Sequence, residues 1–156
     1  MYSHYLMLLT SVHHVYGAII YSTPWRLHVL FLSVPVIVVT ALLSRIINTY
    51  NSFKSSFLFW INWIIILIMS IALIGIFEGI YNHFIKDLLF YTGIDRSTLL
   101  ALFPPPKYEM PNDLFFEVTG VLQAVIVAVL IVCFTRLTVS VFVTKSWEMN
   151  RKLDNE

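Results

Sequence analysis

Cysteine and charged residues are both scarce in this chain. A single thiol, that of Cys133, excludes an intramolecular disulfide, a CxxC redox pair, a cysteine-rich zinc site and covalently attached c-type haem. Charged side chains make up 12% of the 156 residues, about half of the roughly 25% that soluble domains carry. So few charges cannot cover a soluble surface, whereas they suffice where lipid is the solvent.

The chain also lacks an excess of charge of either sign. Its formal net charge is +1, and it has no basic run of the kind that indicates nucleic-acid binding. Hydrophobic residues make up 58% of the sequence, and the mean hydropathy is +0.80. This composition is typical of an integral membrane protein.

Four apolar stretches predict four transmembrane helices, at about 5–21, 24–47, 57–90 and 113–143. The third is the strongest, because FLFWINWIIILIMSIALIGIF holds 21 uncharged residues. A rise of about 1.5 Å per residue carries them across roughly 30 Å of hydrocarbon. Thr23 before Pro24, and Asp113 after Pro111, are typical helix starts.

The expected fold is an all-α integral membrane protein. It comprises a four-helix transmembrane bundle over residues 1–144, a long outer loop over 92–112 between the third and fourth helices, and a polar cytosolic tail over 145–156. Basic residues set its orientation. They gather in and around the turn after the second helix and at the C-terminal end: Arg45, Lys54, Arg136, Lys145, Arg151 and Lys152. We therefore predict a multi-pass protein of the cell membrane with both termini cytoplasmic. The basic residues left on the outer side are fewer: Lys86, Arg96 and Lys107.

Ionisable residues lie inside these apolar stretches or at their rims. An unpaired charge or imidazole in a bilayer costs free energy, so such residues are candidates for a functional site. They are His13, His14, His28, Glu78, His83 and Glu117. Placed on the four predicted helices, they are biased toward the outer half of the membrane, beneath the long loop.

The spacing of these residues argues against a single compact motif. Glu78 and His83 are five residues apart, about 140° around the axis of an α-helix, which is a poor arrangement for sharing one ion. His83 and Asp87 are four apart and can meet, and such a carboxylate often orients a metal-binding imidazole. A shared site therefore has to be assembled from side chains on different helices.

Small residues line faces of two helices. Gly75 and Gly79 form a GxxxG pair, which allows another helix to approach closely. Gly120, Ala124 and Ala128 form a similar face on the fourth helix. We expect these faces to bind either a second copy of the chain or partner subunits within the lipid bilayer.

Histidine and carboxylate side chains on facing helices form a ligand set for transition metals in a bundle. We therefore predict that the six ionisable residues are the ligand pool of a metal site in a redox or oxygen-chemistry subunit. The expected ligand of the site is an ion of iron, copper or zinc, and haem b is a less favoured alternative. The ExxH motif of ferritin-like di-iron proteins is absent, because Glu78 and His83 read ExxxxH.

Other functions stay open, and the sequence does not decide whether the protein is an enzyme. A non-catalytic scaffold or assembly subunit of a larger membrane complex would also use the small-residue faces. Chemistry on a lipid would use Glu78 or Glu117 as general base, yet no Ser–His–Asp order or phosphate-binding glycine loop supports it. A transporter would need oligomerisation, because four helices without repeats rarely form a pathway alone.

Overall fold

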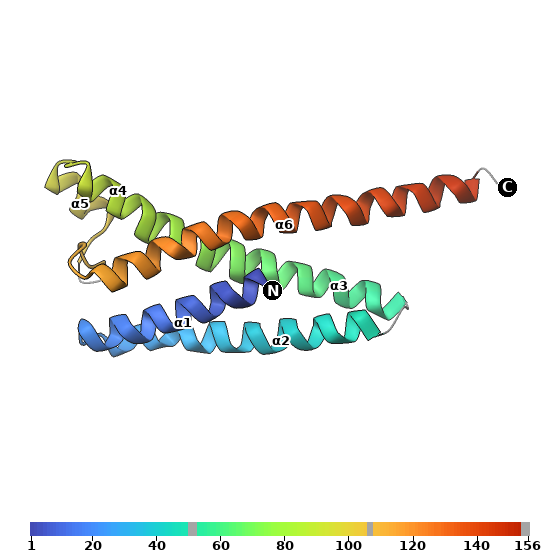
Figure 1. The fold of residues 1–156 in the computed structure, drawn as a ribbon, viewed down its shortest axis with the longest axis horizontal. Coiled ribbons are helices and arrows are strands. Elements are labelled where there is room, and N and C mark those ends of the chain that lie inside the picture. The colour runs from blue at the N-terminus through green and yellow to red at the C-terminus, as the bar shows by residue number, and fades with distance from the viewer. Residues whose placement is uncertain (50–52, 106–107, 154–156) are drawn as a thin grey trace.

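The computed structural model describes residues 1–49, 53–105 and 108–153, and every regular element in these ranges is a helix. Three helices are long and apolar enough to cross a membrane: Pro24–Thr49, Ser56–Tyr91 and Leu114–Val143. Figure 1 shows them extended along one long axis. The prediction of an all-α chain with helices suited to a membrane is confirmed at this level.

The first helix, α1 (Tyr2–Ile20), is not among these three. Its 19 residues fall within the roughly 17–25 residues of a span, but polar side chains lower its hydropathy. Those of Ser3, Thr10, His13 and His14 are buried in the interior. The predicted count of four spans therefore depends on a helix whose polar face is turned inward.

The second helix begins differently from the prediction. Pro24–Val29 form a 3-10 helix, η1, and the α-helix α2 runs over Leu30–Thr49. Thr23 precedes η1 without a side-chain cap. Its hydroxyl accepts from Arg26 Nε at 2.9 Å and donates to the Gly17 carbonyl at 3.4 Å. The turn thereby ties the end of α1 to Arg26.

The third predicted span is a continuous rod of three elements: α3 (Phe53–Ile65), the π-helix η2 (Ile66–Ile85) and α4 (Lys86–Tyr91). In a π-helix the backbone hydrogen bonds join residues five apart, where an α-helix joins residues four apart. Residues five apart therefore share a face. The buried residues of η2 are Ser70, Ile71, Ile74, Gly75, Gly79, Asn82 and His83. The expectation of an α-helical register is wrong in this segment.

The last helix, α6, runs over Leu114–Leu153. Asp113 caps it as predicted, because its Oδ1 accepts the Phe116 N–H at 2.8 Å. The stretch suited to a membrane ends at Val143, as predicted, whereas the helix itself continues to Leu153. The segment KSWEMNRKL contains neither glycine nor proline, the residues that most often end a helix.

The predicted outer loop contains a short helix, α5 (Arg96–Leu102). Asp95 caps it by accepting the Thr98 N–H at 3.0 Å. The Tyr81 hydroxyl donates to the Leu102 carbonyl at 3.3 Å. The segment between α4 and α6 therefore contacts η2, and part of it is a helix where a loop was predicted.

The most extensive packing joins η2 and α6, which cross in Figure 1. A Cβ atom on Gly79 would lie 2.8 Å from the backbone nitrogen of Ala124, so a larger residue does not fit there. Gly75 packs against Val127 in the same way. Gly75, Gly79 and Ala124 thus lie in the contact between η2 and α6, whereas Ala128 of the predicted face is exposed. The binding of a partner through these faces stays a prediction.

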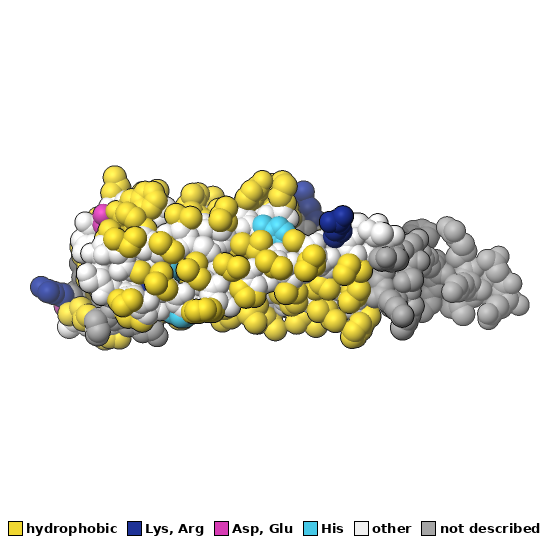
Figure 2. All heavy atoms as spheres, turned by 90° about the horizontal axis from the view of Figure 1, so that it is seen from below, with side chains coloured by type: hydrophobic (Ala, Val, Ile, Leu, Met, Phe, Trp, Pro, Cys, Tyr) yellow, Lys and Arg dark blue, Asp and Glu magenta, His cyan; other side chains and the backbone are white. Residues whose placement is uncertain are grey.

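Apolar side chains dominate the face of the molecule that Figure 2 shows. Over the whole surface of the described residues, large apolar side chains such as Phe31 and Leu114 are 84% and 81% exposed. In the interior, by contrast, Thr10, His13 and Gln123 have no exposed surface. An apolar outside around a partly polar inside is what a lipid solvent favours.

We expect Gly79→Val to destabilise the contact between η2 and α6. The new side chain would meet backbone atoms of Ala124 that cannot rotate away, and such overpacking lowers the free energy of unfolding by about 1–3 kcal/mol. Ala128→Val is the matched control, because Ala128 is exposed on α6. Circular dichroism during chemical unfolding in detergent measures both. Equal stability of the two variants would contradict the packing described.

Acid should release the cap of α5. The hydroxyl of Ser97, then the N–H and hydroxyl of Thr98, donate to Asp95 and lower the pKa of its carboxyl from 3.8 to about 2. A pKa lowered by folding means that the cap stabilises α5 fully above about pH 4 and is lost as the pH falls through about 2. Hydrogen–deuterium exchange of the α5 amides checks this. Asp95→Asn, which caps without titrating, should show no such step.

Candidate metal site

The predicted site residues come from three helices that meet next to η1 and α4. Helix α1 contributes His13 and His14, η2 contributes Glu78 and His83, and α6 contributes Glu117. Ion-pair and ring contacts connect all five. The cluster is assembled across helices, as the spacing of these residues in the sequence requires.

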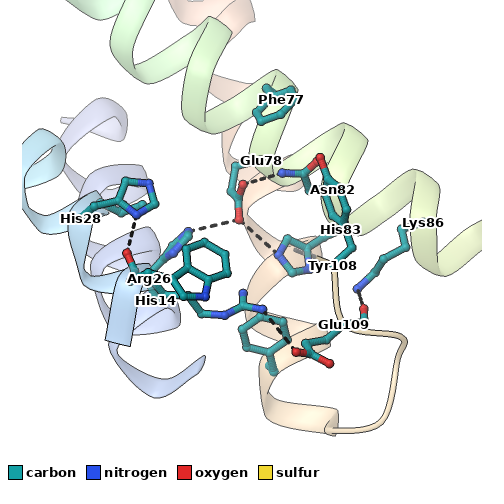
Figure 3. A pocket seen from close by; sticks show the side chains of 13 residues that line it. His14, Arg26, His28, Phe77, Glu78, Asn82, His83, Lys86, Tyr108 and Glu109 are labelled. Atoms are coloured by element: carbon teal, nitrogen blue, oxygen red, sulfur yellow. Dashed lines mark hydrogen bonds and ion pairs between the residues drawn. The ribbon is translucent and has the colours of Figure 1, made fainter. Parts of the chain in front are cut away.

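Glu78 lies between His14 and His83 (Figure 3). Its Oε1 is 3.1 Å from His14 Nε2 and 3.6 Å from His83 Nε2. Its Oε2 accepts a hydrogen bond from Asn82 Nδ2 at 2.7 Å. Asn82 thus fixes one carboxylate oxygen and leaves the other facing two imidazoles. The prediction that Glu78 and His83 diverge is wrong, because the π-helical register puts residues five apart on one face.

The ring orientation of His13 follows from its neighbours. His13 Nδ1 lies 2.9 Å from Thr119 Oγ1, and the Thr119 hydroxyl donates to the Phe115 carbonyl at 2.7 Å. A hydroxyl that has used its one proton can only accept. With the Thr119 proton on that carbonyl, His13 Nδ1 carries the hydrogen of a neutral ring and Nε2 carries the lone pair. That Nε2 is buried and has no hydrogen-bond partner among the described residues.

His83 is oriented in a similar way. Its Nδ1 lies 3.5 Å from Glu117 Oε2, which leaves Nε2 facing Glu78. The same Glu117 oxygen is 3.3 Å from Lys86 Nζ, and Lys86 also donates to the Glu109 carbonyl at 2.8 Å. A carboxylate next to the second ring nitrogen is a common support of a metal-binding histidine. Glu117 is thus placed to orient His83.

Two further residues determine the surroundings of His83. His83 is predicted to meet Asp87, but Asp87 Oδ1 lies 3.6 Å from Lys86 Nζ, and Glu117 contacts the imidazole. Gly120 packs directly on the His83 ring, where a Cβ atom would overlap the imidazole. Glycine at this position lets the ring enter between η2 and α6.

His13, Glu78 and His83 each offer one ligand atom, and these atoms all lie within 4.8 Å of one another. Tetrahedral ligands at about 2.1 Å from an ion are roughly 3.4 Å apart, so movements of about an ångström would close the group. His14 Nε2, at 3.1 Å from Glu78 Oε1, is within reach as a fourth ligand. The arrangement can therefore hold a metal ion after small side-chain rotations.

His28 lies at the edge of this arrangement. It is exposed, and its Nδ1 contacts the Trp25 carbonyl at 2.6 Å. Its ring centre is 6.4 Å from that of His14. Of the six predicted ligands, His28 lies at the rim of the cluster, whereas the ligand atoms of His13, Glu78 and His83 converge.

Two buried cations belong to the site and are not among the predicted ligands. Lys86, which the sequence analysis counts with the outer loop, is 2% exposed. Arg26 is 5% exposed and lies over the rings of Tyr21 and Trp25. The sequence holds a signal for both, because each is a charge inside a candidate span and such charges are rarely without a partner.

A cavity of about 130 Å³ opens beside Glu78 (Figure 3). The imidazoles, cations and carboxylates in its lining are His14, Arg26, His28, Glu78, His83, Lys86 and Glu109. One water needs about 10–15 Å³ of such volume, so the cavity has room for several waters or one small molecule. It gives a ligand direct access to the carboxylate of Glu78.

No protein-family model matches the chain, and no curated protein or solved structure matches it either. The function is therefore inferred from the geometry of the site. The residues that converge around Glu78 carry that inference.

Lys86→Met tests how far the stability of the protein depends on the buried ammonium group of Lys86. Without the ammonium group, Glu117 and Asp87 would lose their partner, and breaking a buried ion pair costs about 3–5 kcal/mol. Adding Glu117→Gln should recover part of the loss, because the amide carries no charge. Arg136→Met, at an exposed position of α6, is the control. Chemical unfolding in detergent measures each variant, and equal losses in the single and double variants would contradict the pairing.

Proposed function

We propose that this chain is a multi-pass membrane protein that binds one transition-metal ion between His13, Glu78 and His83. The convergence of these three side chains carries the proposal. Thr119 and Glu117, both on α6, face the Nδ1 atoms of the two imidazoles. Both Nε2 atoms are thereby left to bind an ion beside the Glu78 carboxylate.

The ion would lie inside a bundle of four helices, in which α1 joins the three long apolar ones. Helix α1 packs on η1, α2, η2 and α6. At about 1.5 Å per residue it is about 28 Å long, close to the roughly 30 Å of the hydrocarbon layer. The distribution of lysine and arginine favours cytoplasmic termini, which puts the site in the outer half of the membrane, on the side of α5.

The donor set favours iron(II) or zinc(II). Two imidazole nitrogens and one carboxylate oxygen occur with both ions, whereas copper(I) prefers sulfur ligands. Three protein ligands leave a coordination position for water or a substrate. When bound, the ion would supply a Lewis acid and, in the case of iron, a redox centre.

Neighbouring residues prepare the three ligands for binding. Asn82 fixes one oxygen of Glu78, and Thr119 holds the ring of His13. Phe116 stacks on that ring, with 4.1 Å between the ring centres. Side chains that are already held in place lose little conformational entropy when an ion binds. His14, beside Glu78 Oε1, is placed either to become a fourth ligand or to hold a proton at Nε2.

The metal content of the purified full-length protein tests this proposal. We expect about one equivalent of iron or zinc per chain by mass spectrometry of the element, and nearly complete loss in His13→Ala and His83→Ala. Thr119→Val should weaken the affinity about 10–100-fold, because the His13 ring would lose its hydrogen-bond acceptor while all three ligands remain.

His4→Ala is the matched control for these variants. His4 lies on the same helix as His13, and its Nε2 is 2.8 Å from Thr40 Oγ1. It should keep the full metal content. The proposal is wrong if the folded wild-type protein takes up neither iron nor zinc, or if the His13→Ala and His83→Ala variants retain the ion. A metal-free scaffold in a membrane complex would then be the better explanation.

A further inference from the structure

Arg26 is a buried cation with unused hydrogen-bonding capacity beside the cavity. Its guanidinium lies 5.0–5.4 Å from the ring centres of Trp25, Phe116 and Tyr21. Its Nε donates to Thr23 Oγ1 at 2.9 Å. Its Nη2 is buried and has no hydrogen-bond partner among the described residues. The aromatic rings hold the guanidinium in place without saturating its N–H groups.

The carboxylate of Glu109 approaches Arg26 without forming a hydrogen bond with it. Glu109 Oε1 is 4.0 Å from Arg26 Nη2, beyond hydrogen-bonding distance, and the Glu109 side chain is 28% exposed. Lys86, also in the cavity lining, is better compensated. Its Nζ lies 2.8–3.6 Å from oxygens of Glu109, Glu117 and Asp87. The less compensated positive charge of the cavity is therefore that of Arg26.

We propose that the cavity binds a small organic monocarboxylate whose carboxylate group pairs with Arg26. A guanidinium and a carboxylate match in two parallel hydrogen bonds, and the ligand's carboxylate would replace the 4.0 Å ion pair with Glu109 by such a contact. Phosphate carries more charge and would call on Lys86, which is already engaged. The bound molecule would lie beside the proposed metal. Its role as a substrate rests on the proposed function, whereas its pairing with Arg26 needs no ion.

The other walls of the cavity suit an organic body. Trp25, Phe77, Tyr108 and Phe116 line it. Its volume is about 130 Å³, and in another protein an apolar cavity of about 150 Å³ takes up benzene. Benzoate is therefore a suitable probe. Benzamide has nearly the same shape without the charge and serves as the matched control ligand.

Glu109 has to give way to such a ligand. Its side-chain carboxylate competes for Arg26, while its backbone carbonyl accepts from Lys86 at 2.8 Å. The side chain can therefore turn outward while the backbone stays in place. Glu109→Gln removes the competing charge at nearly constant shape, so it should tighten the binding of benzoate.

Calorimetric titration of the purified full-length protein in detergent, after treatment with a chelator, tests the pairing. We expect benzoate to bind and benzamide to bind at least about tenfold more weakly. Glu109→Gln should tighten benzoate binding several-fold. Arg26→Gln should weaken it about tenfold or more, and Arg26→Lys should fall between, because it keeps the charge but not the planar fork. Arg136→Gln, at an exposed arginine, should change nothing.

Three results would overturn the proposal: equal binding of benzoate and benzamide, tighter binding of inorganic phosphate, or no effect of Glu109→Gln. The last variant removes no buried cation, so it decides the matter even where Arg26→Gln fails to fold. The outcome is separable from that of the metal site. Benzoate binding by a protein that takes up no metal supports the Arg26 site and overturns the metal proposal. Metal uptake by a protein that does not bind benzoate supports the metal proposal and overturns the Arg26 site.

Discussion

A carboxylate among apolar helices has to be partnered, and Glu78 meets that requirement with side chains of α1 and of its own helix η2. His14 reaches it from α1, and His83 reaches it because η2 keeps residues five apart on one face. Helix α6 comes close enough to support His83 only because Gly120 leaves room for the ring. An unpartnered charge at this depth would cost several kcal/mol. The same contacts that solvate Glu78 therefore position the helices.

The polar groups of the bundle form successive layers with different tasks. His13, Glu78 and His83 form the inner layer, where lone pairs converge. The ion pairs of Lys86 come next and hold Glu117 in place, and the cavity beside Arg26 leads outward from there. The wall of this cavity carries the cations of Arg26 and Lys86 and the carboxylates of Glu78 and Glu109.

Much of this could be predicted from the sequence, because lipid as solvent leaves a strong trace in composition. The apolar stretches predict helices suited to a membrane, and Asp113 marks the start of the last one. Ionisable residues within those stretches identify His13, Glu78 and His83 as members of a site. The parts that could not be predicted depend on tertiary contacts. No local pattern distinguishes a π-helical from an α-helical register. Nor does the positive charge of Lys86 indicate in the sequence which carboxylates pair with it.

The π-helical register of η2 makes chain length as important as residue identity. Removing one residue between Ile66 and Glu78 would leave every functional side chain present in the sequence. The deletion would nevertheless rotate the part of the helix after it by up to about 100° relative to the part before it. Glu78, His83 and Lys86 would then turn together away from α1. A single-codon deletion in this segment is thus a more severe change than most substitutions, and the segment from 66 to 85 should tolerate exchange of its lipid-facing residues far better than any change in their number.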